Sequence, residues 1–338
     1  MAATINDVAR RAGVAKKTVS RVINNEPHVS PVLRSKVEAA IAELGFVPHS
    51  AARQLASNRA FTIGLATGPV PPDLLAMVLS GATYVARENG YALVVAQFDS
   101  DDPTSIVSVC NFARRRQIDG LILGSGPQAV VMEFAALLPL TGVPWVHIGP
   151  HAMPPDVPAV RADDHAGAYA ITEHLLELGH RRIAYARRAS DAHSERQAGF
   201  EAALEAWGIQ RDPRYIAASE HSGFEGGVSV GRVLLAVSPR PTAICALNDE
   251  IAAGVIAAAQ EMGVRVPAEL SVTGFDDFSI AQQTRPALTT VRVPVDAMSR
   301  AAVEILIGMI HGQPPPDQPV RFAPTLVIRE STGSCPTE

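Results

Sequence analysis

The chain has 338 residues, of which 47% are apolar and 19% charged, and its net charge is −5. This length exceeds one ordinary domain, and the composition is that of a soluble globular protein. The sequence contains no apolar run of 18 residues and no apolar stretch at its N-terminus. We therefore expect no membrane span, no secretory signal and a cytoplasmic location. The three cysteines are odd in number and far apart, which argues against a disulfide framework or a metal site.

Charge is distributed unevenly along the sequence. Residues 1–60 contain nine Lys and Arg and four Asp and Glu, a net charge of +5, which leaves −10 on the remaining 278 residues. A basic segment is attracted to phosphate and an acidic segment is repelled by it. The asymmetry therefore predicts that the first part of the chain contacts nucleic acid and that the rest stays clear of it.

Two short helices are predicted within residues 4–24. Thr4 followed by Asp7 is typical of a capping box, and apolar residues then recur at helical spacing as far as Gly13. The polar face of the second helix carries hydrogen-bond donors and no carboxylate: Lys16, Lys17, Ser20, Arg21 and Asn24. Such a face suits the major groove of DNA, where a helix–turn–helix places its second helix. A solvated amphipathic helix would show the same pattern.

A third helix is predicted to begin at Ser30-Pro31, with Ser as the N-cap and Pro at the first helical position, and to end at Gly45. The three helices make a compact headpiece over residues 1–48. Residues 49–58 follow Pro48 and can form only about two helical turns, which are marginal in water by themselves.

From Phe61 onward, short apolar runs alternate with helical stretches, as in a buried parallel sheet with crossover helices. This many units predicts a doubly wound α/β architecture that is too long for one sheet. We therefore expect a core over residues 61–331 with two similar subdomains. We expect a helix near residues 295–311 and a final strand within residues 320–331 to complete both sheets. The expected boundaries are 61–159 plus 292–320 for the first subdomain and 160–291 plus 321–331 for the second.

Several polar residues follow predicted strands of the core, where open α/β sheets bind ligands. Asn248 and Asp249 follow one strand, Asp276 follows another, and Arg196 begins a helix. A carboxylate, an amide and a guanidinium together suit the recognition of vicinal hydroxyls. An alternative role for Asn248-Asp249 is helix N-capping, and we expect one of the two to have it.

The segments TINDVARRAGVAKKTVSRVINNEPHVSP and KVEAAIAELGFVPHSAARQLAS resemble the headpiece and hinge of the lactose-repressor (LacI) family of bacterial transcription factors. The resemblance extends to about Ser331. It implies a homodimer that binds double-stranded operator DNA, with a periplasmic-binding-protein-like core that binds a small-molecule effector. It implies base reading by Lys16, Lys17 and Arg21. It also implies base or backbone contacts by Asn6, Thr18, Ser20, Asn24, His28 and Ser30. One departure is Ala15, where the family usually has Ser.

For residues 49–60 the resemblance implies a hinge helix that folds when it pairs with its twin on DNA. Leu55 would then be the apolar wedge in the minor groove, which kinks the duplex. Ala52 and Ala56 would be the small residues at which two hinge helices touch.

The motifs NDEIAAG, VTGFDD and SERQAGF are also those of the family, which implies that Asn248, Asp276 and Arg196 hold the effector. His221 and Phe224 are weaker candidates on the same wall. On the facing wall, Gly149 replaces an Asp that the family often has, and Asp73 and His147 are the candidates there. We expect a sugar or sugar derivative as effector. A purine or another metabolite that acts as a corepressor remains the alternative.

Enzymes and exported receptors are the competing protein classes. The sequence has no nucleophile elbow, zinc-protease, P-loop or dinucleotide-binding motif, so we expect no catalytic residues, cofactor or metal. An exported sugar-binding receptor would share the core fold but would lack the basic headpiece and would need a signal peptide. The sequence therefore predicts a ligand-responsive transcriptional regulator, expected to repress a carbohydrate-utilisation operon.

Overall fold

The computed structural model describes residues 3–23, 29–46, 59–99, 102–115, 117–189, 194–221 and 223–336. Most of the expected hinge segment lies outside these ranges. Five of the predicted DNA-contacting residues lie outside them as well: Asn24, His28, Ala52, Leu55 and Ala56.

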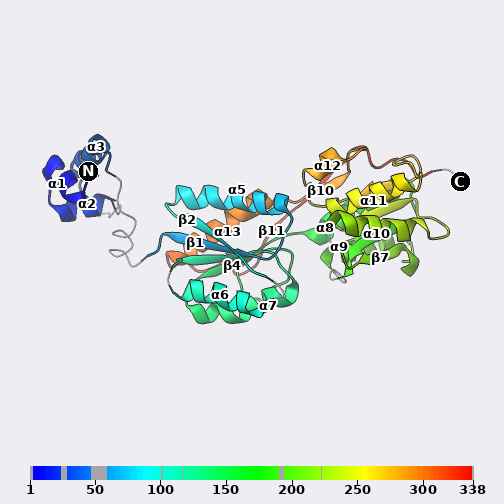
Figure 1. Ribbon diagram of the computed structural model, residues 1–338, viewed down its shortest axis with the longest axis horizontal. Helices are drawn as coiled ribbons and strands as arrows, with labels where there is room; N and C mark the ends of the chain where they lie inside the picture. Colours follow the sequence, from blue (N-terminus) through cyan, green and yellow to red (C-terminus); the bar gives the residue numbers. More distant parts are fainter. Residues whose placement is uncertain are drawn as a thin grey trace.

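The headpiece contains three helices, α1 (Ile5–Ala12), α2 (Lys16–Ile23) and α3 (Pro31–Leu44) (Figure 1). The predicted capping box is present, because the Thr4 side chain accepts from the backbone of Asp7 and the Asp7 side chain accepts from the backbone of Thr4. Gly13 and Gly45 end α1 and α3 in the left-handed conformation, which glycine adopts without steric cost. The helices pack around a small buried core: Val8, Val19, Val22, Val37 and Ala40.

The first subdomain is built on a parallel sheet of six strands. In spatial order the strands are β11 (Val320–Phe322), β5 (Ala159–Ala162), β4 (Trp145–Ile148), β3 (Gly120–Leu123), β1 (Thr62–Thr67) and β2 (Ala92–Gln97). Two layers of helices cover the sheet, α5 (Pro72–Glu88) with α13 (Val295–Ile310) on one face and α6 (Pro103–Arg114) with α7 (Gln128–Leu137) on the other (Figure 1). The 3-10 helix η1 (Leu138–Thr141) follows α7.

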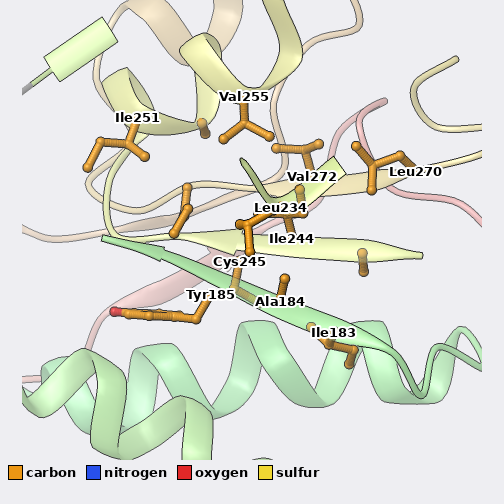
Figure 2. Packing of buried hydrophobic residues seen from close by; sticks show 14 of the residues in the cluster. Ile183, Ala184, Tyr185, Leu234, Ile244, Cys245, Ile251, Val255, Leu270 and Val272 are labelled. Atoms are coloured by element: carbon orange, nitrogen blue, oxygen red, sulfur yellow. The ribbon is translucent and has the colours of Figure 1, made fainter. Parts of the chain in front are cut away.

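The second subdomain is built on a parallel sheet of four strands. In spatial order these are β7 (Ile216–Ser219), β6 (Ile183–Arg188), β8 (Ala243–Ala246) and β9 (Ser271–Thr273). Its helices are α8 (Asp164–Glu177), α9 (Glu195–Ala206), η3 (Pro213–Tyr215), α10 (Gly223–Leu235), α11 (Asp249–Glu261) and α12 (Ile280–Gln283). Figure 2 shows Ile251 and Val255 of α11 packed above the strands that carry Tyr185, Ile244 and Val272.

The chain passes between the subdomains three times, after β5, after β10 (Thr290–Arg292) and after β11. The expected approximate boundaries at residues 159 and 320 fall at the first residues of β5 and β11, which are both strands of the first sheet. The expected single final strand is instead two short strands, since β11 joins the first sheet and β12 (Thr325–Val327) pairs antiparallel with β10. Pro324 lies between them and has no N–H to continue a ladder.

Both sheets point their carboxyl ends at the other subdomain. Asp73, at the start of α5 after β1, accepts hydrogen bonds from the backbone and hydroxyl of Ser279, which lies beyond β9. We call this region the subdomain junction. Among the residues that the structure describes, no helix combines the length and apolarity that a membrane span requires.

Candidate functional site

The predicted DNA-reading helix, α2, packs one face on the headpiece core and exposes a polar face on the opposite side. Val19 and Val22 of α2 are buried in the headpiece core, which fixes the rotation of the helix. The opposite face exposes Lys16, Lys17 and Arg21, and Thr18 and Ser20 are partly exposed. The first turn of α2 contains no acidic residue, so nothing there offsets the positive N-terminal end of the helix.

Three further headpiece residues differ from one another in their surroundings. Asn6 is exposed on the first turn of α1. Ser30 is exposed, and its hydroxyl accepts from the Leu33 backbone as the N-cap of α3. At Ala15, which has no side-chain oxygen, the backbone carbonyl accepts from Thr18 at 2.8 Å. α2 therefore starts without a side-chain cap at that position.

The second subdomain brings the predicted effector residues together around Arg196. Its guanidinium donates to Asp276 Oδ1 at 2.8 Å and Oδ2 at 3.3 Å, and to the carbonyl of Leu247 at 2.9 Å, next to Asn248. It also donates to Asp164 Oδ2 at 2.9 Å. The guanidinium lies 3.9 Å from the centre of the Phe275 ring, a distance at which a cation is attracted to the aromatic face.

These groups are largely removed from water. The exposed fractions of the side chains are 17% for Arg196, 14% for Asp276 and 6% for Asp164. Burial opposes the charge of Arg196, but the two carboxylates outweigh it and raise the pKa of its guanidinium. Burial raises the pKa of Asp276, Arg196 opposes that rise and Asp164 adds to it. Arg196 is thus a fixed cation that is shared by two carboxylates.

Asn248 and Asp249 divide the two roles that their position suggests. Asn248 Oδ1 accepts from the Ile251 backbone, so Asn248 is the N-cap of α11. Asp249 is fully buried and accepts from the Phe278 backbone at 2.7 Å and the Thr290 hydroxyl at 2.5 Å. Asp249 therefore holds the loop that carries Asp276.

The loop after β9 has an unusual backbone. Asp276 and Asp277 both have positive φ, 99° and 58°, which is uncommon outside glycine and often marks functional sites. Asp277 accepts from Arg292 at 2.7 Å and from Arg329 at 2.6 Å. These ion pairs fix the turn and aim Asp276 at Arg196.

A small cavity lies beneath this network. It measures about 10 Å³ and is lined by Arg196, Tyr185, Phe200, Leu247 and Phe275, among others. This volume has room for about one water molecule. The cavity is therefore too small for a sugar-sized ligand.

The remaining candidates of this wall lie near Glu250. His221 is exposed, and Phe224 is 43% exposed at the start of α10. Gly223, beside Phe224, lies next to Glu250, and a Cβ on it would be in ordinary van der Waals contact with the carboxylate oxygen at 3.4 Å. Burial raises the pKa of Glu250, and the carboxylates of Asp276 and Asp73 raise it further.

The facing wall belongs to the first subdomain. His147, at the end of β4, is fully buried, and its Nδ1 lies 3.0 Å from the carbonyl of Leu123. His151 stacks on it at 6.3 Å, and its Nε2 lies 2.7 Å from the carbonyl of Gly126. Asp73 bonds Ser279 across the junction, so it links the two subdomains in this structure.

Four residues of the junction were not predicted from the sequence. Asp164 bonds Arg196, and Ser279 bonds Asp73. Arg161 of β5 donates to Glu195 Oε1 of α9 at 2.6 Å, which is a second link between the subdomains. These partners lie 32 to 206 residues apart in the chain. A local motif therefore carries little signal for them.

Comparisons with known proteins agree with this geometry. Residues 4–49 match the family model described as bacterial regulatory proteins, lacI family, and residues 172–332 match that of a periplasmic binding protein-like domain. The ribose operon repressor of Haemophilus influenzae is 33% identical over 336 residues, which cover 98% of this chain and 99% of the relative. The transcriptional regulator GalR of Escherichia coli is 31% identical over 343 residues, which cover 98% and 96%.

Solved structures show the same likeness over the whole chain. The lac repressor dimer bound to operator and the anti-inducer ONPF has a TM-score of 0.80 and 28% identity, with coverage of 98% of this chain and all of that one. A complex of the regulator CelR with cellobiose has a TM-score of 0.73 and 29% identity, with coverage of 97% and 99%. The chain therefore belongs to the LacI family of bacterial regulatory proteins, which are DNA-binding transcriptional regulators and not enzymes.

Proposed function

We propose that this protein is a cytoplasmic, homodimeric repressor of a carbohydrate-utilisation operon and that a sugar or sugar derivative alters its affinity for the operator. The observation that carries the proposal is the convergence of Arg196, Asp276 and Asn248 at the subdomain junction of a chain with a basic helix–turn–helix headpiece. The junction residues recognise a polyhydroxylated ligand, and the headpiece binds DNA.

In the DNA-binding part, α2 enters the major groove of the operator. Lys16, Lys17 and Arg21 read base edges, where an Arg or Lys pairs best with guanine. Asn6, Thr18, Ser20 and Ser30 contact bases or the phosphate backbone, together with the predicted contacts Asn24 and His28. In the hinge, whose residues lie outside the described ranges, the family resemblance implies that Leu55 enters the minor groove between base steps and that two hinge helices touch at Ala52 and Ala56.

In the effector part, the ligand binds between the two walls of the junction. Asp276 accepts hydrogen bonds from two ligand hydroxyls, Arg196 orients Asp276 and donates to a ring or hydroxyl oxygen, and the Asn248 amide donates a further bond. The relatives support a sugar, because one is a ribose operon repressor and another was solved with cellobiose. His221 and Phe224 border this wall near Glu250, and Asp73 and His147 border the facing wall.

Dimerisation is supported by an apolar edge of the first sheet. β2 is one of the two edge strands, and Val94 and Val95 on it are 40% and 42% exposed. Tyr84 of the neighbouring helix α5 is 48% exposed. An exposed apolar edge strand of this kind is a pairing site in a monomer, so a partner subunit that covers it removes the cost of its exposure.

The junction couples the two activities. The Asp73–Ser279 and Arg161–Glu195 contacts hold the subdomains in one arrangement, and a ligand between the walls favours another. A rotation of the first subdomains in the dimer then changes how the hinge presents the headpieces. Coupling free energies of about 1–3 kcal/mol are typical of such switches, which corresponds to about 5–150-fold in operator affinity.

Thermal-shift screening of a metabolite panel, followed by operator binding with each hit, tests this proposal. We expect at least one free sugar to raise the melting temperature of the core and to change operator affinity by fivefold or more. If no sugar does so and a purine does, the protein is a metabolite-responsive corepressor system instead.

A further inference from the structure

The chain enters the core at the amino end of the first sheet, and a single carboxylate holds this entry. Asp119, the residue before β3, accepts from the backbone N–H of Ala60 at 2.8 Å and from that of Phe61 at 2.6 Å. Its own backbone N–H donates to the carbonyl of Thr62 at 2.8 Å. Hydrogen bonds to an ionised acceptor are stronger than those between neutral groups. Asp119 therefore fixes three consecutive residues at the point where the predicted hinge segment joins the core.

Phe61 has a backbone conformation that this arrangement must maintain. Its φ of 50° lies in the left-handed region, which is a genuine outlier for a bulky side chain. Such a conformation persists only where the surrounding contacts determine it. Here the N–H of Phe61 donates to Asp119, its carbonyl accepts from Ala92 at 2.9 Å, and its ring centre lies 6.1 Å from that of Tyr91. Both peptide groups of Phe61 are thus held, which sets the direction in which the chain leaves the core.

Arg59 forms a second attachment at the same end of the sheet. Its guanidinium donates to the carbonyl of Ile310 at 3.3 Å, and Ile310 is the last residue of α13. The final carbonyls of a helix carry partial negative charge, which favours a cation there. A Cβ on Gly120, next to Asp119, would lie 2.8 Å from Leu306 and 3.0 Å from the Ile310 side chain, so the end of α13 packs directly on β3. We call the Asp119 carboxylate and the Ile310 carbonyl the hinge clamp.

One continuous segment connects the hinge clamp with the loop that carries Asp276. The backbone N–H of Asp276 donates to the carbonyl of Val291 in β10 at 2.8 Å. The chain leaves β10 at Arg292, and α13 begins at Val295 and ends at Ile310, within the first subdomain (Figure 1). The 16 residues of α13 span about 24 Å. Because a helix is a rigid element, a displacement at its first turn is conveyed to its last.

We propose that Asp119 and Arg59 are positioning residues that set the direction in which the hinge leaves the core, and that α13 conveys movement of the Asp276 loop to them. This inference rests on the proposed function, because it assigns the residues through which the junction acts on the headpieces. When the subdomains rotate, the two attachments move as one unit with α13 and β3. The separation of the two headpieces in the dimer then changes, and with it the fit to two operator half-sites.

The test compares two operators by fluorescence anisotropy with the full-length protein. One is the operator selected by the wild type, and the other has one additional base pair at its centre. Asp119→Asn leaves a single acceptor oxygen, Arg59→Met removes the donor, and Arg59→Lys retains one. Asp212→Asn is the matched control, because Asp212 accepts from the Arg214 backbone at 2.9 Å at the amino end of the second sheet, in the subdomain that the hinge does not join.

Each protein is titrated with both operators, alone and with ribose, galactose or cellobiose. Calorimetry gives the affinity for the sugar, and the melting temperature establishes that each variant is folded. We expect the wild type to bind the lengthened operator more weakly by a factor of about ten or more, because its headpieces have a fixed separation. Asp119→Asn and Arg59→Met should bind both operators within about threefold of each other, since a loosened hinge tolerates either spacing.

The same two variants should lose the effect of sugar on operator affinity, from about fivefold or more to less than about twofold. Their affinity for the sugar itself should stay within about threefold of wild type, because the hinge clamp lies at the opposite end of the sheet from the junction. Arg59→Lys and Asp212→Asn should behave as wild type in every measurement. A role confined to the stability of the core would change the melting temperature and leave the operator preference intact.

Wild-type discrimination between the two operators in both Asp119→Asn and Arg59→Met would overturn the inference, as would equal binding of both operators by the wild type. A loss of sugar affinity of about tenfold or more in either variant would also overturn it, because the residue would then act through the fold of the effector site. If no sugar changes operator binding by the wild type, the proposed function fails, and the comparison of operator spacings still decides whether the hinge clamp positions the headpieces.

Discussion

Replacing Asp276 with Asn separates the effector response from DNA binding. Asp276 accepts two hydrogen bonds from Arg196, at 2.8 and 3.3 Å, and hydrogen bonds to charged groups contribute about 1.5–3 kcal/mol each. Arg196 keeps Asp164 and the Leu247 carbonyl in the variant, so its charge stays compensated. Burial already raises the pKa of Asp276, so the negative charge of its carboxylate contributes less to the stability of the folded protein. We therefore expect the free energy of unfolding to fall by only about 1.5–3 kcal/mol, the contribution of one such bond and less than the about 3–6 kcal/mol of two.

The loss of ligand affinity should be larger. If two sugar hydroxyls donate to the Asp276 carboxylate, weakening both bonds costs about 3 kcal/mol, or about 150-fold in affinity. Urea denaturation measures the stability, calorimetry the sugar affinity, and fluorescence anisotropy the binding to operator. We expect operator affinity without sugar to stay within threefold of wild type and the sugar response to disappear.

Asp277→Asn is the matched control for this experiment. Asp277 is the adjacent residue, is also buried and also has positive φ, but its carboxylate bonds Arg292 and Arg329. We expect this variant to lose stability and to keep its sugar response. The reasoning fails if Asp276→Asn responds to sugar like wild type, or if Asp277→Asn loses the response to the same extent.

Three further predictions concern the headpiece, a buried carboxyl group and the division of the chain. Arg21→Ala should cost about 1–3 kcal/mol at one operator base pair and relax the preference there, whereas a uniform loss over all sequences would make Arg21 a phosphate contact. Burial raises the pKa of the Asp249 carboxyl group well above its usual value, so the folded protein binds a proton there more tightly than the unfolded chain does. The stability that this proton contributes is present at low pH and is lost as pH rises. The melting temperature of Asp249→Asn relative to wild type should therefore increase between pH 4 and pH 8, and a constant difference would contradict this cause. Removal of residues 1–58 should leave a folded dimer that still binds the effector, and analytical ultracentrifugation with circular dichroism would detect an unfolded or monomeric product.

Features fixed by local physical chemistry were predictable from the sequence. The Thr4–Asp7 capping box, the Ser30 N-cap and the Gly45 C-cap each depend on residues a few positions apart, and all three are present. The alternation of strands and helices in the core was predictable for the same reason. β5 was not recognised as a strand, because its four residues include Arg161, whose burial depends on Glu195 far along the chain.

The site was predictable only in part. Arg196 and Asp276 were identified from the motifs around them, and the structure brings them into contact. Asp164, the second carboxylate partner of Arg196, could not be deduced, since only the packing of α8 against α9 brings it to the guanidinium. The positive φ of Asp276 is also a property of the folded loop, which the buried carboxylate of Asp249 supports through the backbone of Phe278.

The central claim is that α2 reads a specific duplex and that a ligand at the junction modulates this reading. Selection of fragments from a genomic DNA library by the full-length protein, followed by anisotropy titrations from 50 to 200 mM salt with and without sugar, tests it most directly. We predict enrichment of a pseudopalindromic site, affinity that falls steeply with salt, and a change in affinity with at least one free sugar. Equal affinity for all fragments at every salt concentration, with no effect of any sugar, would contradict the claim.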